Sequence, residues 1–370
     1  MNPLRYSRQE LLPGIGPEGQ SRIHEARILC VGAGGLGCPA SLYLAAAGVG
    51  TLGLIDPDVV DLSNLQRQIL FAESELGLPK VEAACRRLSS LNSEVRLTPH
   101  QDRLTAANAL SILRGYDVIV DGTDNFAAKF LINDAATRLG LPVVHGALSQ
   151  FEGRVSVFWA RHGPCYRCLH PNPPRSFIQN CAEAGVLGAV AGVVGTLQAV
   201  EALKLAATAD VAQGPLRSLL GRLLVVDAAT MEPSVFPIRK VPECPGCSRP
   251  PDSIVLEDVP GGCFTSAANS AFETVSVEAL ATRLDEYTLV DVREPHEWAQ
   301  GHLPGALNWP LSRLQRQEWP YLASTDKPCV LYCQAGVRSA RALELLRPRV
   351  PSLRHLAGGL SEWRGALTRR

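Results

Sequence analysis

The stretch Arg27-Ile-Leu-Cys-Val-Gly-Ala-Gly-Gly-Leu-Gly37 is the strongest indication of fold in the longer part of this chain. Its apolar first half predicts a buried strand, and the glycines after it predict a tight turn into a helix over residues 36–48. Such a turn brings the backbone N–H groups of a helix N-terminus close to an anion. The stretch therefore predicts a nucleotide-phosphate site at Gly32, Gly34, Gly35 and Gly37.

Strands and helices alternate after this turn. We expect a helix over residues 80–91 and strands over residues 51–55, 116–120, 141–144 and 154–158. This alternation is typical of an α/β fold with a doubly wound, Rossmann-like sheet. Ligands in such sheets bind outside the carboxyl ends of the strands, and Asp56 and Asp124 both follow a predicted strand.

Composition bounds the class of protein. The chain has 370 residues, which predicts two domains at about 150 residues each. A formal net charge of zero argues against a nucleic-acid-binding protein that acts through bulk charge. The uncharged run over residues 184–200 is glycine-rich and shorter than the roughly 20 apolar residues of a membrane helix, so we expect a buried or subunit-interface helix there.

Cysteine usage indicates the compartment. The chain opens on polar and charged residues, which do not resemble a secretory signal. Its 11 cysteines, an odd number, then favour free thiols and metal ligands over disulfides. We therefore expect a cytoplasmic protein that does not enter a membrane.

A change of pattern predicts where the first domain ends. Prolines, glycines and small polar residues over residues 251–272 are typical of a linker. A second α/β pattern follows, with strands expected over residues 288–293 and 328–332. We predict a first domain over residues 1–250 and a smaller α/β domain over residues 273–370.

The residues around the glycine turn distinguish between possible nucleotides. An acid at Asp56 can accept hydrogen bonds from ribose hydroxyls, which suits NAD and ATP equally. An excess of cations favours a triphosphate whose pyrophosphate must leave. The polar side chains that we expect near the phosphates are Arg8, Asn64, Arg67 and Lys80. Asp124 is then expected to hold the Mg²⁺ that bridges the phosphates.

Four motifs resemble the MoeB/ThiF family of ubiquitin-activating-like adenylyltransferases: Arg5-Tyr-Ser-Arg-Gln9, Gly32-Ala-Gly-Gly-Leu-Gly37, Leu62-Ser-Asn-Leu-Gln-Arg-Gln68 and Gly122-Thr-Asp-Asn125. The resemblance implies an enzyme that adenylates the C-terminal Gly-Gly carboxylate of a ubiquitin-like sulfur carrier protein. It implies that Asp56 binds ribose and that Asp124, with Asn125 beside it, meets Mg²⁺ and the nucleotide. It also implies phosphate contacts from Asn64, Arg67 and Lys80, and a homodimer in which Arg8 reaches the partner's site.

Two C-x-x-C pairs predict a metal site. They are Cys165-Tyr-Arg-Cys168 and Cys244-Pro-Gly-Cys247. Four thiolates around one ion give the closed, tetrahedral arrangement of structural Zn²⁺. A redox motif would instead be a single pair at the start of a helix in a thioredoxin-like context. We therefore predict a zinc site, which the family resemblance also implies.

Cys181 follows a proline-rich loop and precedes the predicted helix over residues 184–200, where a thiol can be a reactive nucleophile. In the resembling enzymes a cysteine here takes part in carrier or sulfur transfer in some members, and a bystander cysteine is the alternative. His145 is expected to be a core residue with a satisfied hydrogen bond. The other cysteines are expected to be packing or incidental residues: Cys30, Cys38, Cys85, Cys263 and Cys329.

A second nucleophile is predicted at Cys333, in Cys333-Gln-Ala-Gly-Val-Arg338-Ser339. An apolar strand ends at this cysteine, and a glycine-bearing loop and a helix follow, so unpaired N–H groups can stabilise a thiolate or persulfide. Phosphatases of similar layout place five residues between the cysteine and the arginine, whereas four stand here, and the tighter loop favours a persulfide. We expect Arg338 to brace the loop, and Asp291 and Arg293 to shape the pocket.

The whole second domain resembles a rhodanese sulfurtransferase. The motifs are Asp291-Val-Arg-Glu-Pro-His-Glu-Trp298, Gly301-His-Leu-Pro-Gly305, the Cys333 loop and Leu356-Ala-Gly-Gly359. A fusion of the two families implies that ATP activates the carrier and that the Cys333 persulfide then supplies sulfur, with thiosulfate or a cysteine desulfurase as donor. Molybdopterin synthesis is the expected pathway, and thiamine, tRNA thiolation or a thio-metabolite are alternatives. An NAD-dependent oxidoreductase and a non-catalytic carrier-binding scaffold are more remote alternatives.

Overall fold

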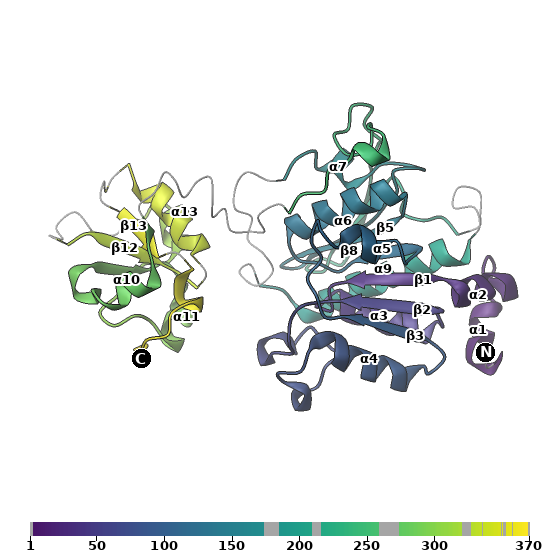
Figure 1. Cartoon of the computed structure of the whole chain (residues 1–370), viewed down its shortest axis with the longest axis horizontal. Helices are drawn as coiled ribbons and strands as arrows, with labels where there is room; N and C mark the ends of the chain where they lie inside the picture. The colour runs from purple at the N-terminus through teal and green to yellow at the C-terminus, as the bar shows by residue number, and fades with distance from the viewer. Residues whose placement is uncertain are drawn as a thin grey trace. The chain divides into compact units, whose positions relative to one another are not determined.

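A computed structural model describes residues 3–173, 185–208, 216–258, 274–319, 327–334, 336–348, 350, 353–356 and 358–368. The chain divides into two compact units, Met1–Val259 and Pro260–Arg370 (Figure 1). Cys181 and Cys263 lie outside the described residues, so the structure does not address the prediction made for either.

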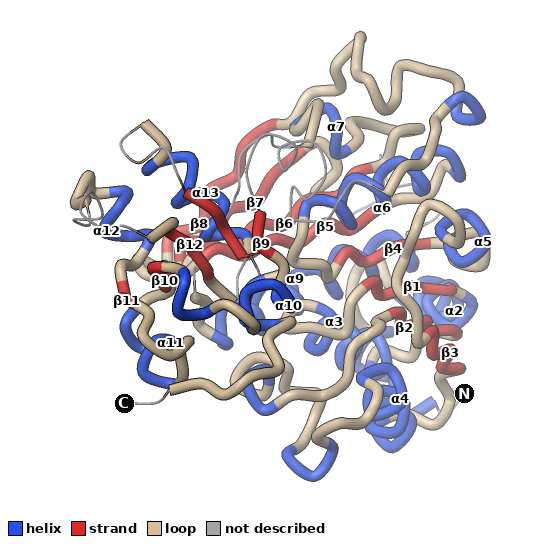
Figure 2. The backbone as a smooth tube through the Cα atoms, turned by 60° about the vertical axis from the view of Figure 1, so that its left-hand side comes forward, coloured by secondary structure: helices blue, strands red, loops and turns tan. Residues whose placement is uncertain are grey.

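Unit 1 is built on an eight-stranded sheet of order β3-β2-β1-β4-β5-β6-β7-β8. From β3 to β5 each pair of neighbours is parallel, and from β5 to β8 each pair is antiparallel, so the sheet is mixed. The strands can be followed in red in Figure 2. Their bounds are β1 Arg27–Val31, β2 Thr51–Ile55, β3 Arg96–His100, β4 Val118–Asp121, β5 Val143–Ser149, β6 Glu152–Phe158, β7 Arg222–Asp227 and β8 Glu232–Pro237.

Helices cover both faces of this sheet. Along β1, Ile28 and Cys30 enter one apolar core while Leu29 and Val31 enter another, because successive strand residues point to opposite faces. The α-helices are α1 Pro3–Glu10, α2 Gly16–Glu25, α3 Gly37–Ala46, α4 Lys80–Leu91, α5 Ala109–Leu113, α6 Phe126–Leu139, α7 Tyr166–Leu169 and α9 Gly188–Ala207. Three short 3₁₀ turns are η1 Leu62–Asn64, η2 Glu73–Glu75 and η3 Pro251–Ser253. The predicted doubly wound, Rossmann-like α/β class is confirmed.

The predicted elements β1, β2 and α4 have the bounds that the sequence indicated. The edge strands β3 and β8 were not anticipated. Every residue of β8 is exposed and the strand contains Pro233 and Pro237, so it lacks the apolar run that marks a buried strand.

The predicted helix over residues 184–200 is α9, but the described helix begins at Gly188 and continues to Ala207. The predicted helix stopped at residue 200, just before the charged Glu201. In the structure the helix continues through Glu201, whose carboxylate accepts a hydrogen bond from the Leu219 backbone N–H at 2.7 Å. Among the described residues, α9 is the one helix long and apolar enough to span a membrane, and half of its most apolar window is buried inside the protein. It packs against α3, β5 and β6, as a core helix does.

Unit 2 is a smaller α/β unit with a five-stranded sheet of order β11-β10-β12-β13-β9, all parallel. The strands are β9 Thr274–Val275, β10 Thr288–Asp291, β11 Leu307–Asn308, β12 Cys329–Tyr332 and β13 Leu353–Leu356. The helices are α10 Val277–Ala281, α11 Pro295–Gln300, α12 Leu311–Gln315 and α13 Val337–Leu346, with 3₁₀ turns η5 Leu284–Glu286 and η6 Gly359–Ser361. Two separate apolar cores, one on each face of the sheet, confirm the predicted α/β class.

Candidate nucleotide, metal and sulfur sites

The glycine turn after β1 is packed against the turn after β4. Gly32 has φ of 96°, in the left-handed region that favours glycine, and a Cβ at this position would lie 3.0 Å from the Gly122 carbonyl oxygen. A Cβ at Gly37 would lie 1.8 Å from the Gly32 carbonyl oxygen. These contacts place the N-terminus of α3 and the Gly122–Asn125 turn at the same edge of the sheet.

Asp56 links the end of β2 to the glycine turn. Its Oδ2 accepts a hydrogen bond from the Ala33 backbone N–H at 2.8 Å, and its Oδ1 accepts one from the Asp58 N–H at 2.9 Å. Burial raises the pKa of this carboxyl group, and the Lys80 ammonium opposes that shift. Lys80 Nζ lies 3.1 Å from Asp58 Oδ2 and 3.9 Å from Asp56 Oδ1. The structure therefore brings the predicted ribose-binding acid and phosphate-binding lysine together.

The segment that contains η1 also lies against the glycine turn. Arg67 packs its methylene groups 3.4 Å from where a Cβ on Gly35 would stand, and its Nη1 donates to the Ser63 carbonyl. Asn64 is half-buried one helical turn earlier. Gln68, to which the sequence assigned no role, is 4% exposed, and its Oε1 has no partner among the described residues. Its Nε2 would lie 3.8 Å from a Cβ on Gly34.

The glycine turn, with Asp56, Arg67, Gln68 and Lys80 around it, forms a nucleotide cradle that fits a nucleoside triphosphate. Gly34 leaves its side-chain space open, since a Cβ there would meet only the Gln68 Nε2 at 3.8 Å, whereas Arg67 and Ala191 close off that space at Gly35. Lys80 and Arg67 bring positive charge to this turn, and their contacts with phosphate stay predictions. Arg8 is exposed in the last turn of α1, so its reach into a partner's site stays a prediction.

Asp124 is exposed after β4, in a turn held by Asp121. Asp121 Oδ1 accepts hydrogen bonds from Thr123 N and Oγ1 at 3.1 and 2.6 Å. Asn125 Oδ1 accepts the Ala128 N–H at 2.9 Å and so caps α6. The Asn125 amide nitrogen lies 3.5 Å from Asp124 Oδ1.

A buried charged cluster supports this turn, and the sequence did not reveal it. The second Asp121 oxygen is 2.9 Å from Lys129 Nζ and 3.1 Å from His145 Nδ1. Although burial alone would raise it, the pKa of Asp121 is lowered, because Lys129 and His145 favour the carboxylate. Burial, with Lys129 nearby, lowers the pKa of His145 to about 4. The prediction of a buried His145 with a hydrogen-bond partner is confirmed.

The two C-x-x-C pairs come together although 75 residues separate Cys168 from Cys244 in the chain. The four Sγ atoms of Cys165, Cys168, Cys244 and Cys247 all lie within 4.8 Å of one another. Burial and the neighbouring thiols raise the pKa of Cys165, so these sulfurs need a cation to be stable together as thiolates. The donor set fits a four-coordinate, soft metal ion.

Helix α6 holds the first cysteine pair. Asn133 Oδ1 accepts the Tyr166 N–H at 2.7 Å. Arg167, between the two cysteines of the pair, forms a two-bond ion pair with Asp134, at 2.7 Å for each bond. Tyr166 and Arg167 are the two middle residues of the Cys165-x-x-Cys168 motif. Their bonds to Asn133 and Asp134 therefore fix the two cysteines against the core of unit 1.

Cys333 directly follows β12 in unit 2 and is 1% exposed. Its carbonyl accepts the Leu360 N–H at 2.9 Å, and the Gln334 carbonyl accepts the Ser361 N–H at 2.8 Å. After Gln334 the chain turns into α13, whose N-cap residue Gly336 has a φ of 83°. The start of this helix is therefore braced by the Gly358–Ser361 segment.

Two ion pairs flank Cys333. Arg338 forms a two-bond pair with Glu297 on α11, at 2.6 and 2.8 Å. Arg293 is buried against Asp291 at 2.7 Å and also donates to the Gln334 side chain at 3.3 Å. The bracing role expected of Arg338 and the shaping roles expected of Asp291 and Arg293 stay predictions.

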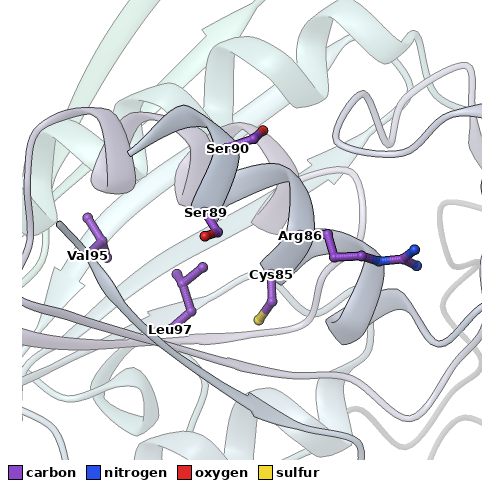
Figure 3. A pocket seen from close by; sticks show the side chains of 6 residues that line it. All are labelled: Cys85, Arg86, Ser89, Ser90, Val95 and Leu97. Atoms are coloured by element: carbon purple, nitrogen blue, oxygen red, sulfur yellow. The ribbon is translucent and has the colours of Figure 1, made fainter. Parts of the chain in front are cut away.

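An open surface cavity of about 590 Å³ lies elsewhere, between residues of α4 and residues in and just before β3 (Figure 3). Cys85, Arg86, Ser89, Ser90, Val95 and Leu97 line it. Burial raises the pKa of Cys85 to about 11, which keeps its thiol protonated and unreactive near neutral pH. This cavity contains none of the residues of the three candidate sites.

A Rossmann-like sheet with an acid and a lysine at its glycine turn, a four-cysteine site and a cysteine at a strand–helix turn define a nucleotide-using α/β enzyme with a sulfur-transfer domain. Residues 6–247 match the ThiF family and residues 276–366 match the rhodanese-like domain. The chain belongs to the ThiF family and carries a C-terminal rhodanese-like domain.

Full-length relatives share both parts. The chain is 41% identical to the probable adenylyltransferase/sulfurtransferase MoeZ of Mycobacterium tuberculosis, over 97% of this chain and 92% of the relative. It is 40% identical to the adenylyltransferase and sulfurtransferase MOCS3 of Sus scrofa, over 97% of this chain and 85% of the relative. A crystal structure of E. coli MccB with ATP covers 67% of this chain and 75% of its own, with a TM-score of 0.58 and 23% identity, which supports the fold alone. The chain is an adenylyltransferase and sulfurtransferase.

Proposed function

We propose that this enzyme uses ATP to adenylate the C-terminal carboxylate of a ubiquitin-like sulfur carrier protein that ends in Gly-Gly, and then converts that carboxylate to a thiocarboxylate. The observation that carries the proposal is one chain with both the Asp56–Lys80 nucleotide cradle and Cys333 at the start of α13. The same pairing of domains in the MoeZ and MOCS3 relatives supports it.

In the first step the carrier carboxylate attacks the α-phosphorus of ATP, and the bond to pyrophosphate breaks. Asp56 orients the ribose, while Asn64, Arg67 and Lys80 stabilise the charge that moves onto the leaving pyrophosphate. Asp124, in the turn held by Asp121, would hold the Mg²⁺ that neutralises the phosphates. The open side-chain space at Gly34 supports this placement of the phosphates.

In the second step the terminal sulfur of a Cys333 persulfide attacks the acyl carbon, the bond to AMP breaks, and an acyl disulfide forms. A thiolate, for which Cys181 is the candidate, then attacks the Cys333 sulfur. The thiocarboxylate leaves, the two cysteines form a disulfide, and a cellular thiol reductant must return both to thiols. Thiosulfate or the persulfide of a cysteine desulfurase would reload Cys333.

Several properties of the assembly belong to the same proposal. We propose Zn²⁺ at the four cysteines, because tetrahedral thiolate sites suit this ion. A homodimer is supported by apolar residues left exposed on α9, among them Val193 and Val200, and Arg8 would enter the partner's site. We place the first domain at residues 1–250, the linker at 251–272, the second domain at 273–370, the enzyme in the cytoplasm and its pathway in molybdopterin synthesis. Thiamine, tRNA thiolation and thio-metabolite pathways remain the alternative destinations for the sulfur.

The test is the intact mass of candidate Gly-Gly carriers after incubation with the enzyme, Mg-ATP and thiosulfate. We expect exchange of one carrier oxygen for sulfur, which requires ATP and is lost in Cys333→Ala. Cys85→Ala is the control, because burial raises the pKa of that thiol to about 11 and Cys85 is not a residue of any candidate site. Unchanged carriers, together with no carrier-dependent exchange between ATP and pyrophosphate, would refute carrier activation.

A further inference from the structure

A buried histidine lies behind the sulfur loop, by which we mean the described residues Cys333, Gln334 and Gly336 to Ser339. His355 is in β13, paired in register with Leu331 of β12. Leu353, two residues earlier on the same strand, packs in one apolar cluster with Leu331 and Cys333. Because strand residues alternate between faces, His355 is on the same face of the sheet as Cys333.

The His355 ring makes no hydrogen bond of normal geometry with the described residues. The side chain is 3% exposed, and among the described residues neither Nδ1 nor Nε2 has a hydrogen-bond partner of normal geometry. Burial lowers the pKa of the imidazole, and the adjacent Gly336 backbone only partly opposes this shift, so the ring is neutral near neutral pH. Two unsatisfied buried nitrogens destabilise a fold, and leucine would fill the same space without that cost.

The backbone beside the ring controls the sulfur loop. Gly336 is the left-handed residue that starts α13, and its carbonyl accepts the Ser339 hydroxyl at 2.9 Å. Its nitrogen would lie 2.7 Å from a Cβ on Gly359, so that side of the turn is also closely packed. Gly336 precedes the first N–H groups of α13 and stands three residues after Cys333, so the orientation of its peptide sets where these groups point.

We propose that His355 is a positioning residue of the sulfur site, whose imidazole supports the Gly336 peptide from behind and fixes the direction of the N–H groups that receive the Cys333 persulfide. This inference rests on the proposed role of Cys333. The ring does not touch the donor or the carrier, and it acts through the loop. A neutral imidazole offers one donor and one acceptor, so one of its two nitrogens carries the interaction.

The test uses the full-length enzyme and three substitutions. His355→Leu removes both nitrogens, His355→Asn keeps an amide near Nδ1, and His355→Gln keeps one near Nε2. Leu353→Met, on the same strand face, is the control for a change in packing. The measurements are the rate at which thiosulfate adds one sulfur to Cys333, the rate of Cys333 alkylation by iodoacetamide, the thermal midpoint, and ATP–pyrophosphate exchange in unit 1.

We expect His355→Leu to slow sulfur loading at least tenfold with an unchanged or higher thermal midpoint and normal exchange. Either asparagine or glutamine, but not both, should restore loading to within threefold of the wild-type rate. Wild-type loading in a folded His355→Leu enzyme would overturn the proposal, as would an equal loss in all four variants. Where the leucine variant does not fold, equal rates for the asparagine and glutamine variants would overturn it.

Failure of the proposed function would give a different pattern. A wild-type enzyme that takes up no sulfur at Cys333 would refute the persulfide role itself. The alkylation rate of Cys333 then decides the positioning role, which predicts a change of at least threefold in His355→Leu and none in Leu353→Met.

Discussion

Gly37 stands directly over the carbonyl oxygen of Gly32, at a distance that leaves no room for a Cβ, which would be 1.8 Å from that oxygen. Gly34 is in the same turn, but a Cβ there would meet only the Gln68 amide, at 3.8 Å. We therefore expect Gly37→Ala to destabilise unit 1 by about 3 kcal/mol or more through backbone displacement. Gly34→Ala should fold normally and bind ATP at least tenfold more weakly, because its methyl group enters the phosphate cradle. Urea unfolding and equilibrium ATP binding test the pair, and equal stabilities of the two variants would contradict this contrast.

Lys80 is buried between Asp56 and Asp58, so its ammonium is held at the glycine turn before any phosphate arrives. Lys80→Met keeps the apolar length of the side chain and removes the charge. We expect ATP–pyrophosphate exchange to fall by about 100-fold or more, since a charge-stabilising group in the transition state is worth about 3 kcal/mol. Lys240→Met, at an exposed position on the same unit, should retain wild-type exchange. A loss in the apparent affinity for ATP, with normal turnover at saturation, would instead assign Lys80 to ground-state binding.

His145 should make unit 1 sensitive to mild acid. Its pKa is about 4 in the folded protein, below the usual value near 6.5, so the unfolded chain binds the proton more readily between these two values. The resulting stability is fully present above about pH 6.5 and is lost as the pH falls towards 4, by about 3 kcal/mol in total. His145→Asn should flatten this part of the stability profile, whereas the exposed His162→Asn should not. Parallel pH profiles of urea unfolding for wild type and His145→Asn would show that the histidine makes no such contribution.

The four-cysteine site should hold one metal ion per chain, which elemental analysis of the purified enzyme can measure. Cys168→Ser and Cys247→Ser remove one ligand each and should lose the metal. We expect the thermal midpoint of unit 1 to drop by roughly 10 °C, because metal binding contributes directly to folding. Cys85→Ser, outside the cluster, should keep both the metal and the midpoint. Metal-free wild-type protein of unchanged stability would mean that the four thiols need no ion.

The local parts of this enzyme could be predicted from sequence. Buried strands such as β1 and β2 have apolar runs. The glycine turn has a spacing of glycines after a strand that is typical of a nucleotide-phosphate site. The edge strand β8 could not be predicted, since exposed strands contain no such run. The same difference applies to the sites. The four cysteines stand in two C-x-x-C pairs and Asp56 follows a predicted strand, whereas no sequence pattern marked Lys129 or His355.

The two α/β parts, the glycine turn, the cysteine pairs and the position of Cys333 after a strand could all be inferred from sequence, because each depends on residues adjacent in the chain. The meeting of distant groups depends on the packing of the folded chain. Asp121 is the centre of a buried cluster because Lys129 from α6 and His145 from β5 both contact one of its carboxylate oxygens inside the protein. His355 becomes notable because folding buries its ring on the Cys333 face of the sheet, with no hydrogen bond of normal geometry to the described residues. Burial and pairing are properties of the packed chain, and they set protonation and orientation through desolvation and charge that no stretch of sequence contains.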